Sequence, residues 1–526
     1  MTVLKQTFSF FKCWRRLYLL TLLGCLPFIF HFIWGNHDWG WVKDYTPLFS
    51  GVFEGRFSQF ILPIILFSGN VLPVLTVGVA MAFLSITAVL LLKLWNVPQK
   101  NYVYLLLGLN ITLAPYTISW FYFAFITLSC LSWTAVAAGV YYFLEKKIFN
   151  STVTFGVSSI LFMLALGGYP PVINMIGVIF FTLVLRDLCF EKISCKDIVK
   201  KYFPYVCVVI SSLLLFLLVM HLLKKYGLQY STYNTAGIDL KNLPSKILFT
   251  LKNSINQFVV SKSFISSFYK KTMLGICIIA LAILWKKLPK KVPNICFFVV
   301  AVIGLLMSSV ATVLVAENIS YVVMEPRIEF FSLPYIYVFA GGILLASETT
   351  FIRNFGLLAL SLLVFYNANT MSFAAKVWNL GFRAEGTLVD RFISRLDENP
   401  RFLPNRRYAL VQGGTLDIRS RFYPPKKGEV VDVYTLSAPY IPWHLPEKTF
   451  TFYYPQRFVS DGFDIYWQFV DPAKIPYSPE LRNYIFNFAA PWPSRRAVYV
   501  DSDIIVLTLT RNGEQAAKNW FFHNFK

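Results

Sequence analysis

The chain has 526 residues, of which 56% are hydrophobic and only 14% are charged. Because a soluble globular domain typically contains about 25% charged residues, this composition excludes a wholly soluble protein. The formal net charge is +22, but the basic residues lie in short clusters between apolar runs and form no continuous basic face, so we expect no nucleic-acid partner.

Sequence motifs for metals and nucleotides are absent. The eight cysteines contain no CxxC pair, the five histidines form no HExxH motif, and no glycine is followed by lysine, as a P-loop requires. We therefore expect no metal site and no cofactor.

About eleven apolar segments are long enough for a spanning helix, which needs roughly 20 mostly apolar residues. They lie at residues 17–34, 72–92, 102–118, 121–144, 150–169, 172–188, 203–223, 272–285, 294–316, 330–347 and 355–372. The first ends in bulky residues with no small-residue cleavage site, so we expect an uncleaved helix. The sequence predicts an α-helical, polytopic membrane protein.

Lysine and arginine in the short connections predict the orientation of these helices. With the amino terminus in the cytoplasm, the connections on that side hold basic residues at 93–100, 146–147, 192–201, 286–291 and 353. This agreement predicts a multi-pass protein of the bacterial inner membrane. Its transmembrane domain comprises residues 1–373, with outer loops at 35–72 and 224–271, and a periplasmic domain follows at 374–526.

The outer loop 224–271 departs from the orientation rule because it is rich in lysine, beginning with Lys224 and Lys225. Part of this loop, residues 247–268, is apolar but interrupted by polar residues. The pattern fits either a helix lying in the membrane interface or a solvated loop.

The tail has the composition of a soluble domain and is long enough to bury its own core. Short runs rich in aliphatic and aromatic residues predict strands at 408–411, 430–434, 450–454 and 504–509, and hence a mixed α/β domain. The triplet Asp501-Ser502-Asp503 has the letters of a DxD metal motif. It falls on the side away from cytoplasmic nucleotide sugars, and it fits a strand-edge turn better.

The first outer loop concentrates ionisable residues in a segment held by the membrane at both ends. Asp38 and Asp44 lie among tryptophans typical of the interfacial belt, and the pair Gly55-Arg56 follows. A carboxylate at the bilayer surface is partly desolvated, which raises its basicity, so either aspartate could deprotonate a sugar hydroxyl as a general base. The alternative is a polar loop that only caps two helices.

Together these features resemble the GT-C class of lipid-linked sugar transferases, and more narrowly the type II glucosyltransferase family of O-antigen modification and serotype conversion. That family has an aspartate in its first loop, then a Gly-Arg pair, and a Pro-Arg near a late helix; here Asp38, Gly55-Arg56 and Pro326-Arg327 hold those places. An Asn-Pro-aromatic element that opens the family's fourth helix is matched in part by Ala114-Pro115-Tyr116. The charged residues that usually follow this element are missing here.

The resemblance implies a glycosyltransferase. Its donor would be a polyprenyl-phosphate sugar, most often glucose, and its acceptor a lipid-linked polysaccharide such as the O-antigen of lipopolysaccharide. Asp38 or Asp44 would deprotonate the acceptor hydroxyl, the anomeric centre would be inverted, and Arg327 would stabilise the leaving phosphate. Because Glu325 and Glu329 flank Arg327, an ion pair with a neighbouring glutamate is the alternative for this arginine.

Other substrate-binding candidates lie on the same predicted side of the membrane. They are Arg56, Lys224, Lys225, Glu325 and Tyr169. Tyr169 belongs to a Gly-Gly-Tyr-Pro-Pro turn between the fifth and sixth spans, where a place in the aromatic belt is the alternative. For the two lysines the alternative is snorkelling at a helix end.

Two other functions suit a protein of this class. A transporter or flippase of lipid-linked oligosaccharide typically has charged residues near the midplane of its spans, and a structural assembly subunit needs no catalytic residue. The predicted spans are nearly free of internal charge, and the polar groups gather at one interface. This pattern favours chemistry at the membrane surface, with the lipid bilayer, a lipid-linked donor and a lipid-linked acceptor as partners.

Overall fold

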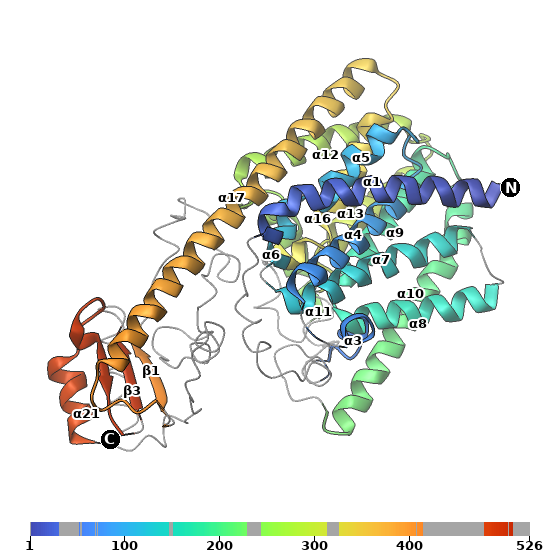
Figure 1. The fold of residues 1–526 in the computed structure, drawn as a ribbon. Helices are drawn as coiled ribbons and strands as arrows, with labels where there is room; N and C mark the ends of the chain where they lie inside the picture. Colours follow the sequence, from blue (N-terminus) through green and yellow to red (C-terminus); the bar gives the residue numbers. More distant parts are fainter. Residues whose placement is uncertain are drawn as a thin grey trace. The chain divides into compact units, whose positions relative to one another are not determined.

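A computed structural model provides the structure of the chain. It describes residues 2–30, 52, 55–68, 70, 72–121, 123–146, 151–228, 243–262, 264–312, 326–404, 406, 408–413, 478–502 and 504–508. The chain divides into two compact units, and a boundary between them follows Ala375, inside helix α17 (Thr350–Asp397). The transmembrane domain was predicted to end at residue 373, but this helix continues through that position without a break. The first unit is helical, and the second contains a small sheet (Figure 1).

The first unit is built from helices that overlap all the predicted apolar segments. They are α1 (Thr2–Phe30), α3 (Ile61–Phe67), α4 (Pro73–Leu94), α5 (Asn101–Thr112), α6 (Ile118–Phe121), α7 (Ala124–Lys146), α8 (Ser151–Gly168), α9 (Val172–Cys189), α10 (Cys195–Lys225), α11 (Leu243–Asn256), α12 (Ser267–Lys287), α13 (Val292–Ser308), α15 (Pro326–Glu329), α16 (Leu333–Leu345) and the first part of α17. Among the described residues, nine helical segments are long and apolar enough to cross a membrane, and α13 is apolar but shorter. The prediction of a mostly helical, polytopic membrane protein is confirmed.

The third predicted span is broken near its end. α5 ends at Thr112, and after a 3-10 turn at Pro115–Thr117 the chain continues into α6 with a bend of 42°. Pro115 accounts for the break, because it has no N–H to continue the helix and it forces the residue before it out of the α region. Ala114 accordingly has an extended ψ of 140°. The Ala114–Tyr116 element therefore breaks the third span and does not open the fourth.

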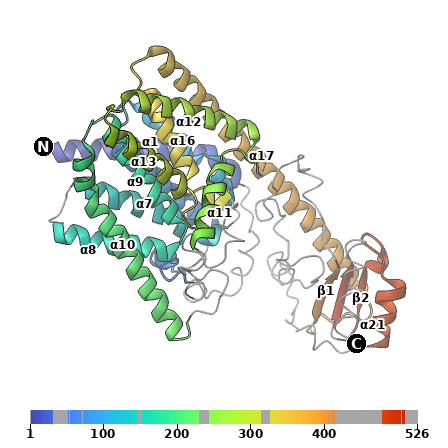
Figure 2. The same cartoon turned by 180° about the vertical axis from the view of Figure 1, so that it is seen from behind.

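The spans pack side by side in the first unit. α4 lies along α7, α9 along α13, and α12 along α16, and Figures 1 and 2 both show α8 beside α10. Because successive spans alternate in direction, the α8–α9 turn and the start of α12 lie at one end of the unit, which we call the turn end. The starts of α10 and α13 lie at the other end, which we call the lysine end after Lys196, Lys200 and Lys291.

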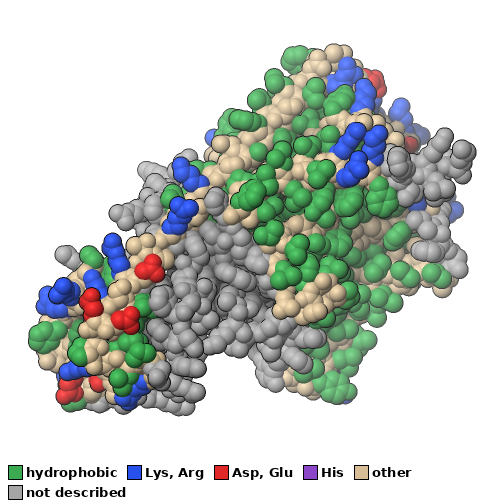
Figure 3. All heavy atoms as spheres, in the orientation of Figure 1, with side chains coloured by type: hydrophobic (Ala, Val, Ile, Leu, Met, Phe, Trp, Pro, Cys, Tyr) green, Lys and Arg blue, Asp and Glu red, His purple; other side chains and the backbone are tan. Residues whose placement is uncertain are grey.

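Apolar side chains cover much of the outside of the helical unit (Figure 3). On α10, for example, Phe203, Leu214 and Leu218 are all more than half exposed. α16, in contrast, is buried at every residue and is apolar all round, as expected of a central helix. A soluble protein rarely exposes apolar surface on this scale, so the exposed faces are those that contact lipid.

At the lysine end, a closed network of charges ties three helices together. Arg186 of α9 contacts Glu145 of α7 at 2.8 Å and Asp187 at 2.5 Å. Lys201 of α10 contacts the same two carboxylates at 3.0 and 2.7 Å, and the Tyr202 hydroxyl donates to Asp187 at 2.8 Å. Two cations and two carboxylates balance here, so we assign this network to holding α7, α9 and α10 together.

The second unit contains a three-stranded sheet with the order β1-β3-β2. β1 (Ala409–Gly413) pairs in parallel with β3 (Ile504–Thr508), and β2 (Val498–Val500) pairs antiparallel with β3. The strands predicted at 408–411 and 504–509 are confirmed. Those predicted at 430–434 and 450–454 lie outside the described residues.

Two contacts of charged residues organise this second unit. Arg395, near the end of α17, lies 3.9 Å from the Trp492 ring centroid and donates to the Ser494 carbonyl at 2.6 Å. Asp501 lies between β2 and β3, in the strand-edge position predicted for it, and accepts from the Ser478 hydroxyl at 3.0 Å.

Candidate functional site

Segments far apart in the sequence meet at the turn end. The first outer loop reaches the end of α8, where the Ser58 N–H donates to the Gly167 carbonyl at 3.1 Å. The Trp120 ring of α6 lies 5.4 Å from the Tyr169 ring of the α8–α9 turn and 5.7 Å from the Phe331 ring, which follows α15. Trp120, Tyr169 and Phe331 form one aromatic cluster, because Tyr169 and Phe331 are themselves 5.4 Å apart.

Two arginines lie beside this aromatic cluster. The Arg56 guanidinium is 5.3 Å from the Tyr169 ring centroid, and the Arg327 guanidinium is 4.4 Å from the Phe123 ring centroid. Both arginines also lie near the buried Cys130 thiol of α7. An aromatic face holds a guanidinium in a defined plane, and the edge of that plane carries the N–H donors that bind a phosphate or carboxylate. Three predicted residues, Arg56, Tyr169 and Arg327, are thus brought together.

A buried ion-pair cluster is linked to Arg327 through α15. Glu329, on the same short helix, accepts from the Lys262 Nζ at 2.5 Å, and its second oxygen lies 3.6 Å from the Lys270 Nζ. The Lys270 ammonium also donates to the Gln257 carbonyl at 2.6 Å. The three ionisable side chains are at most 2% exposed. We call Lys262, Lys270 and Glu329 the buried triad.

The structure describes one of the two glutamates considered as an ion-pair partner of Arg327. Of the two glutamates beside this arginine, Glu329 is engaged by two lysines from the outer loop 224–271, and Glu325 lies outside the described residues. Among the described residues two ammonium groups share one carboxylate, which gives the triad an excess of positive charge away from water. Such an excess favours the binding of an anion nearby.

Several buried polar atoms at the turn end have no hydrogen-bond partner among the described residues. They include the Trp120 Nε1, the Tyr269 hydroxyl and the Gln257 Oε1. The rings of Tyr116 and Tyr337 each lie 6.3 Å from that of Tyr269. More than about 90% of buried polar atoms in proteins are paired, so a group of unpaired ones marks a place for water or a ligand. A sugar, with hydroxyls that both donate and accept, has the chemistry to pair with them.

Helix α11 buries its polar face and exposes its apolar face, which is the reverse of a surface helix in water. Lys246, Thr250 and Asn253 lie on successive turns of one face and are buried, whereas Leu248 and Ile255 on the other face are 70% and 63% exposed. This arrangement favours a helix embedded in the membrane interface over a solvated loop. The helix ends at Asn256 and does not span the expected 247–268, because the chain turns after it to bury Lys262 against Glu329.

The remaining predicted residues fall into two groups. Asp38, Asp44 and Glu325 lie outside the described residues. Lys224 and Lys225 are exposed in the last turn of α10, which favours snorkelling at a helix end. No group of three or more histidine, cysteine, aspartate or glutamate side chains that could hold a metal occurs within the described ranges.

Sequence reasoning missed the buried triad as part of the site. One signal was present, because the lysines of loop 224–271 break the orientation rule. Lys262 and Lys270 depart from the orientation rule because they are buried inside the protein, beside a carboxylate, and are not exposed at a membrane surface. Trp120 carried no signal, since its place at the end of a broken span is visible only in the fold.

Comparison with known proteins gives one match. A family model described as glucosyl transferase GtrII matches residues 43–345, which is more than half of the chain. The matched interval contains Arg56, Tyr169, Arg327 and the buried triad; it includes Asp44 but begins after Asp38. No curated protein and no solved structure matches the chain.

Proposed function

The chain belongs to the glucosyl transferase GtrII family, and on that premise we propose that it moves glucose from polyprenyl phosphate to a lipid-linked polysaccharide of the O-antigen type. The family and the apolar helices make it a membrane glycosyltransferase. The donor, the acceptor and the periplasmic face of the bacterial inner membrane are the further parts of the proposal. Basic connections between spans typically stay in the cytoplasm, so we expect the lysine end on that side. This supports the periplasmic face for the turn end.

The observation that carries the proposal is the convergence of Arg56 and Arg327 at the turn end. Each guanidinium group lies over an aromatic ring at the end of a bundle of apolar helices, where a lipid phosphate would lie. The excess positive charge of the buried triad adds to the attraction for a phosphodiester. The Trp120 Nε1 and the Tyr269 hydroxyl, which have no hydrogen-bond partner among the described residues, lie at the same end, where they can bind the sugar.

The proposed reaction is a single displacement at the anomeric carbon. Asp38, or Asp44, takes the proton of the acceptor hydroxyl, and the hydroxyl oxygen forms a bond to the anomeric carbon. The bond between that carbon and the phosphate oxygen breaks, and its electron pair leaves with polyprenyl phosphate. Arg327 stabilises the negative charge that develops on the departing phosphate. Direct displacement inverts the anomeric centre.

The test uses the purified full-length protein with synthetic polyprenyl-phosphate glucose and a lipid-linked polysaccharide acceptor. Transfer of labelled glucose to the acceptor, with loss of the signal in Arg327→Ala, is the expected result. The matched control is Arg353→Gln, which changes an exposed arginine of α17 at the lysine end and should retain transfer. Movement of the donor across a vesicle membrane without transfer would make the protein a flippase and overturn the proposal.

A further inference from the structure

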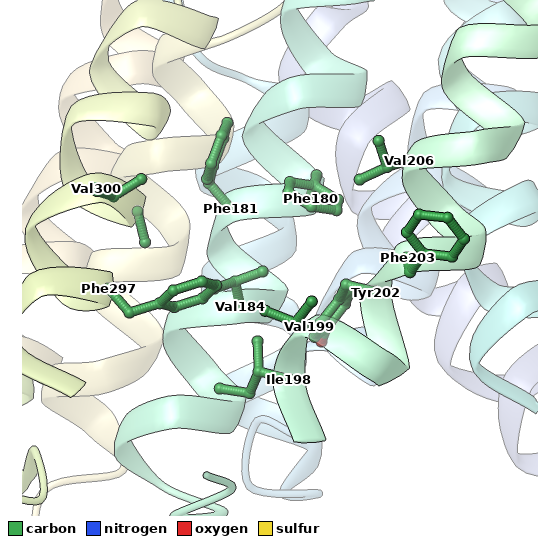
Figure 4. A pocket seen from close by; sticks show the side chains of 11 residues that line it. Phe180, Phe181, Val184, Ile198, Val199, Tyr202, Phe203, Val206, Phe297 and Val300 are labelled. Carbon is green, nitrogen blue, oxygen red and sulfur yellow. The ribbon is translucent and has the colours of Figure 1, made fainter. Parts of the chain in front are cut away.

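An apolar groove lies between α9, α10 and α13, on the outside of the helical unit. It has a volume of about 170 Å³ and is open on one side. Six of the side chains that line it are Phe181, Val184, Val199, Phe203, Phe297 and Val300. Figure 4 shows Phe297 and Val300 on one wall and Val199 and Phe203 on the other.

The groove is lined almost entirely by carbon. Tyr202, its one polar side chain, uses its hydroxyl to donate to Asp187 at 2.8 Å and so turns its ring to the groove. Phe203 lies on α10, which is long enough to span the membrane, and Val300 lies on the shorter apolar helix α13; they are 64% and 61% exposed, so the open side of the groove faces lipid. The volume is smaller than the 300–1,000 Å³ typical of a small-molecule pocket and suits a length of hydrocarbon chain.

The groove belongs to the lysine end and not to the candidate site. Val184 lies 12 residues after Val172 on α9, which places it about 18 Å from the turn end along the helix axis. Beyond the groove, α10 and α13 begin side by side, since the Cys195 thiol donates to the Asn294 Oδ1 at 2.8 Å. The groove and these two helix starts therefore form one continuous surface.

Three exposed lysines lie on this surface. Lys196 and Lys200 lie on the same face of α10 as Val199 and Phe203, one turn apart, and Lys291 immediately precedes α13. Within the described part of the chain none of the three forms an ion pair. The neighbouring Lys201 and Lys287, in contrast, are paired with carboxylates.

We infer that this surface binds an anionic glycerophospholipid of the leaflet at the lysine end. One acyl chain occupies the groove, and the phosphate of the headgroup is bound by Lys196, Lys200 and Lys291. The apolar lining selects a hydrocarbon chain, and the three cations complement a headgroup with a net negative charge. This site is separate from the proposed transfer of sugar, because it lies at the opposite end of the spans from Arg327.

The test is a count of retained lipid by native mass spectrometry of the full-length protein. The protein is reconstituted in vesicles of phosphatidylglycerol and phosphatidylcholine and then extracted into detergent. Wild type is expected to retain one phosphatidylglycerol, and a variant with Lys196→Gln, Lys200→Gln and Lys291→Gln to retain at least tenfold less. The matched control removes three exposed cations of the same end away from the groove, Lys12→Gln, Lys100→Gln and Arg353→Gln, and should retain the lipid.

A second variant tests the groove itself. Val300→Trp fills the groove from an exposed position, so it should displace the lipid without lowering the unfolding temperature. Equal loss of lipid in the control variant, retention of phosphatidylcholine in place of phosphatidylglycerol, or retention of added polyprenyl phosphate at this surface would each overturn the inference. None of these readings depends on sugar transfer, so the inference and the proposed function fail separately.

Discussion

Lys262 and Glu329 form a buried ion pair of 2.5 Å across 67 residues of sequence. The pair joins the turn that follows α11 to α15, the short helix that carries Arg327. Because α15 has only four residues, its own hydrogen bonds hold it weakly, and the ion pair fixes its position. The geometry of Arg327 therefore depends on Lys262 and Lys270 of the outer loop 224–271.

Removing the carboxylate of this pair is expected to destabilise the protein. Glu329→Gln leaves two buried ammonium groups without a counter-charge, which costs about 3–5 kcal/mol. Thermal unfolding of the purified protein should show a clearly lower midpoint. The double variant Glu329→Gln with Lys262→Met removes one of those charges and should unfold at a higher temperature than Glu329→Gln alone. If the double variant is the less stable of the two, the pair does not act as described.

Arg327 is expected to contribute to the chemical step more than to stability. Arg327→Ala should lower kcat by about 10²–10³-fold, the loss typical of removing one group that stabilises charge in a transition state. Arg327→Lys should recover part of kcat, because it restores the charge without the planar donors. Rates of glucose transfer and unfolding midpoints are measured together. A fall in kcat that follows the fall in stability in both variants would leave Arg327 with a structural role only.

The general base is tested by comparing two aspartates of the first outer loop. Asp38→Asn should lower kcat by about 10²–10⁴-fold, the range for removal of a general base, while Asp44→Asn should stay close to wild type. The reverse pattern would assign the base to Asp44, the aspartate inside the interval that matches the family. Undiminished kcat in both variants would remove the first loop from the mechanism.

The contact between the first loop and α8 predicts a strong effect at one glycine. A Cβ at Gly167 would overlap the Phe57 ring, next to Arg56, so Gly167→Ala should displace this loop and reduce transfer at least tenfold. Gly156→Ala on the same helix is the matched control, because a Cβ there meets no atom within 4 Å. Equal activity of the two variants would show that the position of Phe57 does not matter for transfer.

The sheet of the second unit should lose stability in acid. Burial alone would raise the pKa of Asp501, but hydrogen bonds from the Ser502 N–H and the Ser478 and Tyr499 hydroxyls hold it below its usual range. A depressed pKa contributes stability above about pH 4, the ordinary value for aspartate, and this contribution is lost as the pH falls below it.

Hydrogen exchange of residues 498–508 in the full-length protein measures this dependence. After correction for the intrinsic effect of pH on amide exchange, these residues of the wild type should exchange faster below about pH 4, the range in which Asp501 becomes protonated. Asp501→Asn should show a flatter dependence. An equally steep dependence in the variant would assign the acid sensitivity to other carboxylates.

The membrane helices could be predicted because lipid imposes a simple rule on sequence: a span needs enough apolar residues to cross. The boundaries of α9 follow the predicted 172–188 within one residue for this reason. The bend at Pro115 was not predicted, although a proline signal was present, because an apolar run continues on both sides of it. The predicted limits of α11 were wrong, since the helix ends at Asn256 and the chain then turns towards Lys262, which is buried against Glu329.

The candidate site could be predicted in part. Arg56 and Arg327 could be named because the Gly55-Arg56 and Pro326-Arg327 pairs resemble those of the family, and Tyr169 because it lies in the turn between two predicted spans. The buried triad could not be assembled from sequence, since the pairing of Lys262 with Glu329 depends on how distant helices pack. Nothing in the spacing of Trp120 and Phe331 indicates that their rings meet.

The order of the buried triad along the chain has a consequence for biosynthesis. Lys262 and Lys270 leave the ribosome well before Glu329, so both ammonium groups reach the membrane while their counter-ion is still untranslated. A lone lysine within a bilayer is costly. These two lysines can therefore be buried against their counter-ion only once α15 has been made, so the turn after α11 and the start of α12 are expected to reach their final packing late in synthesis.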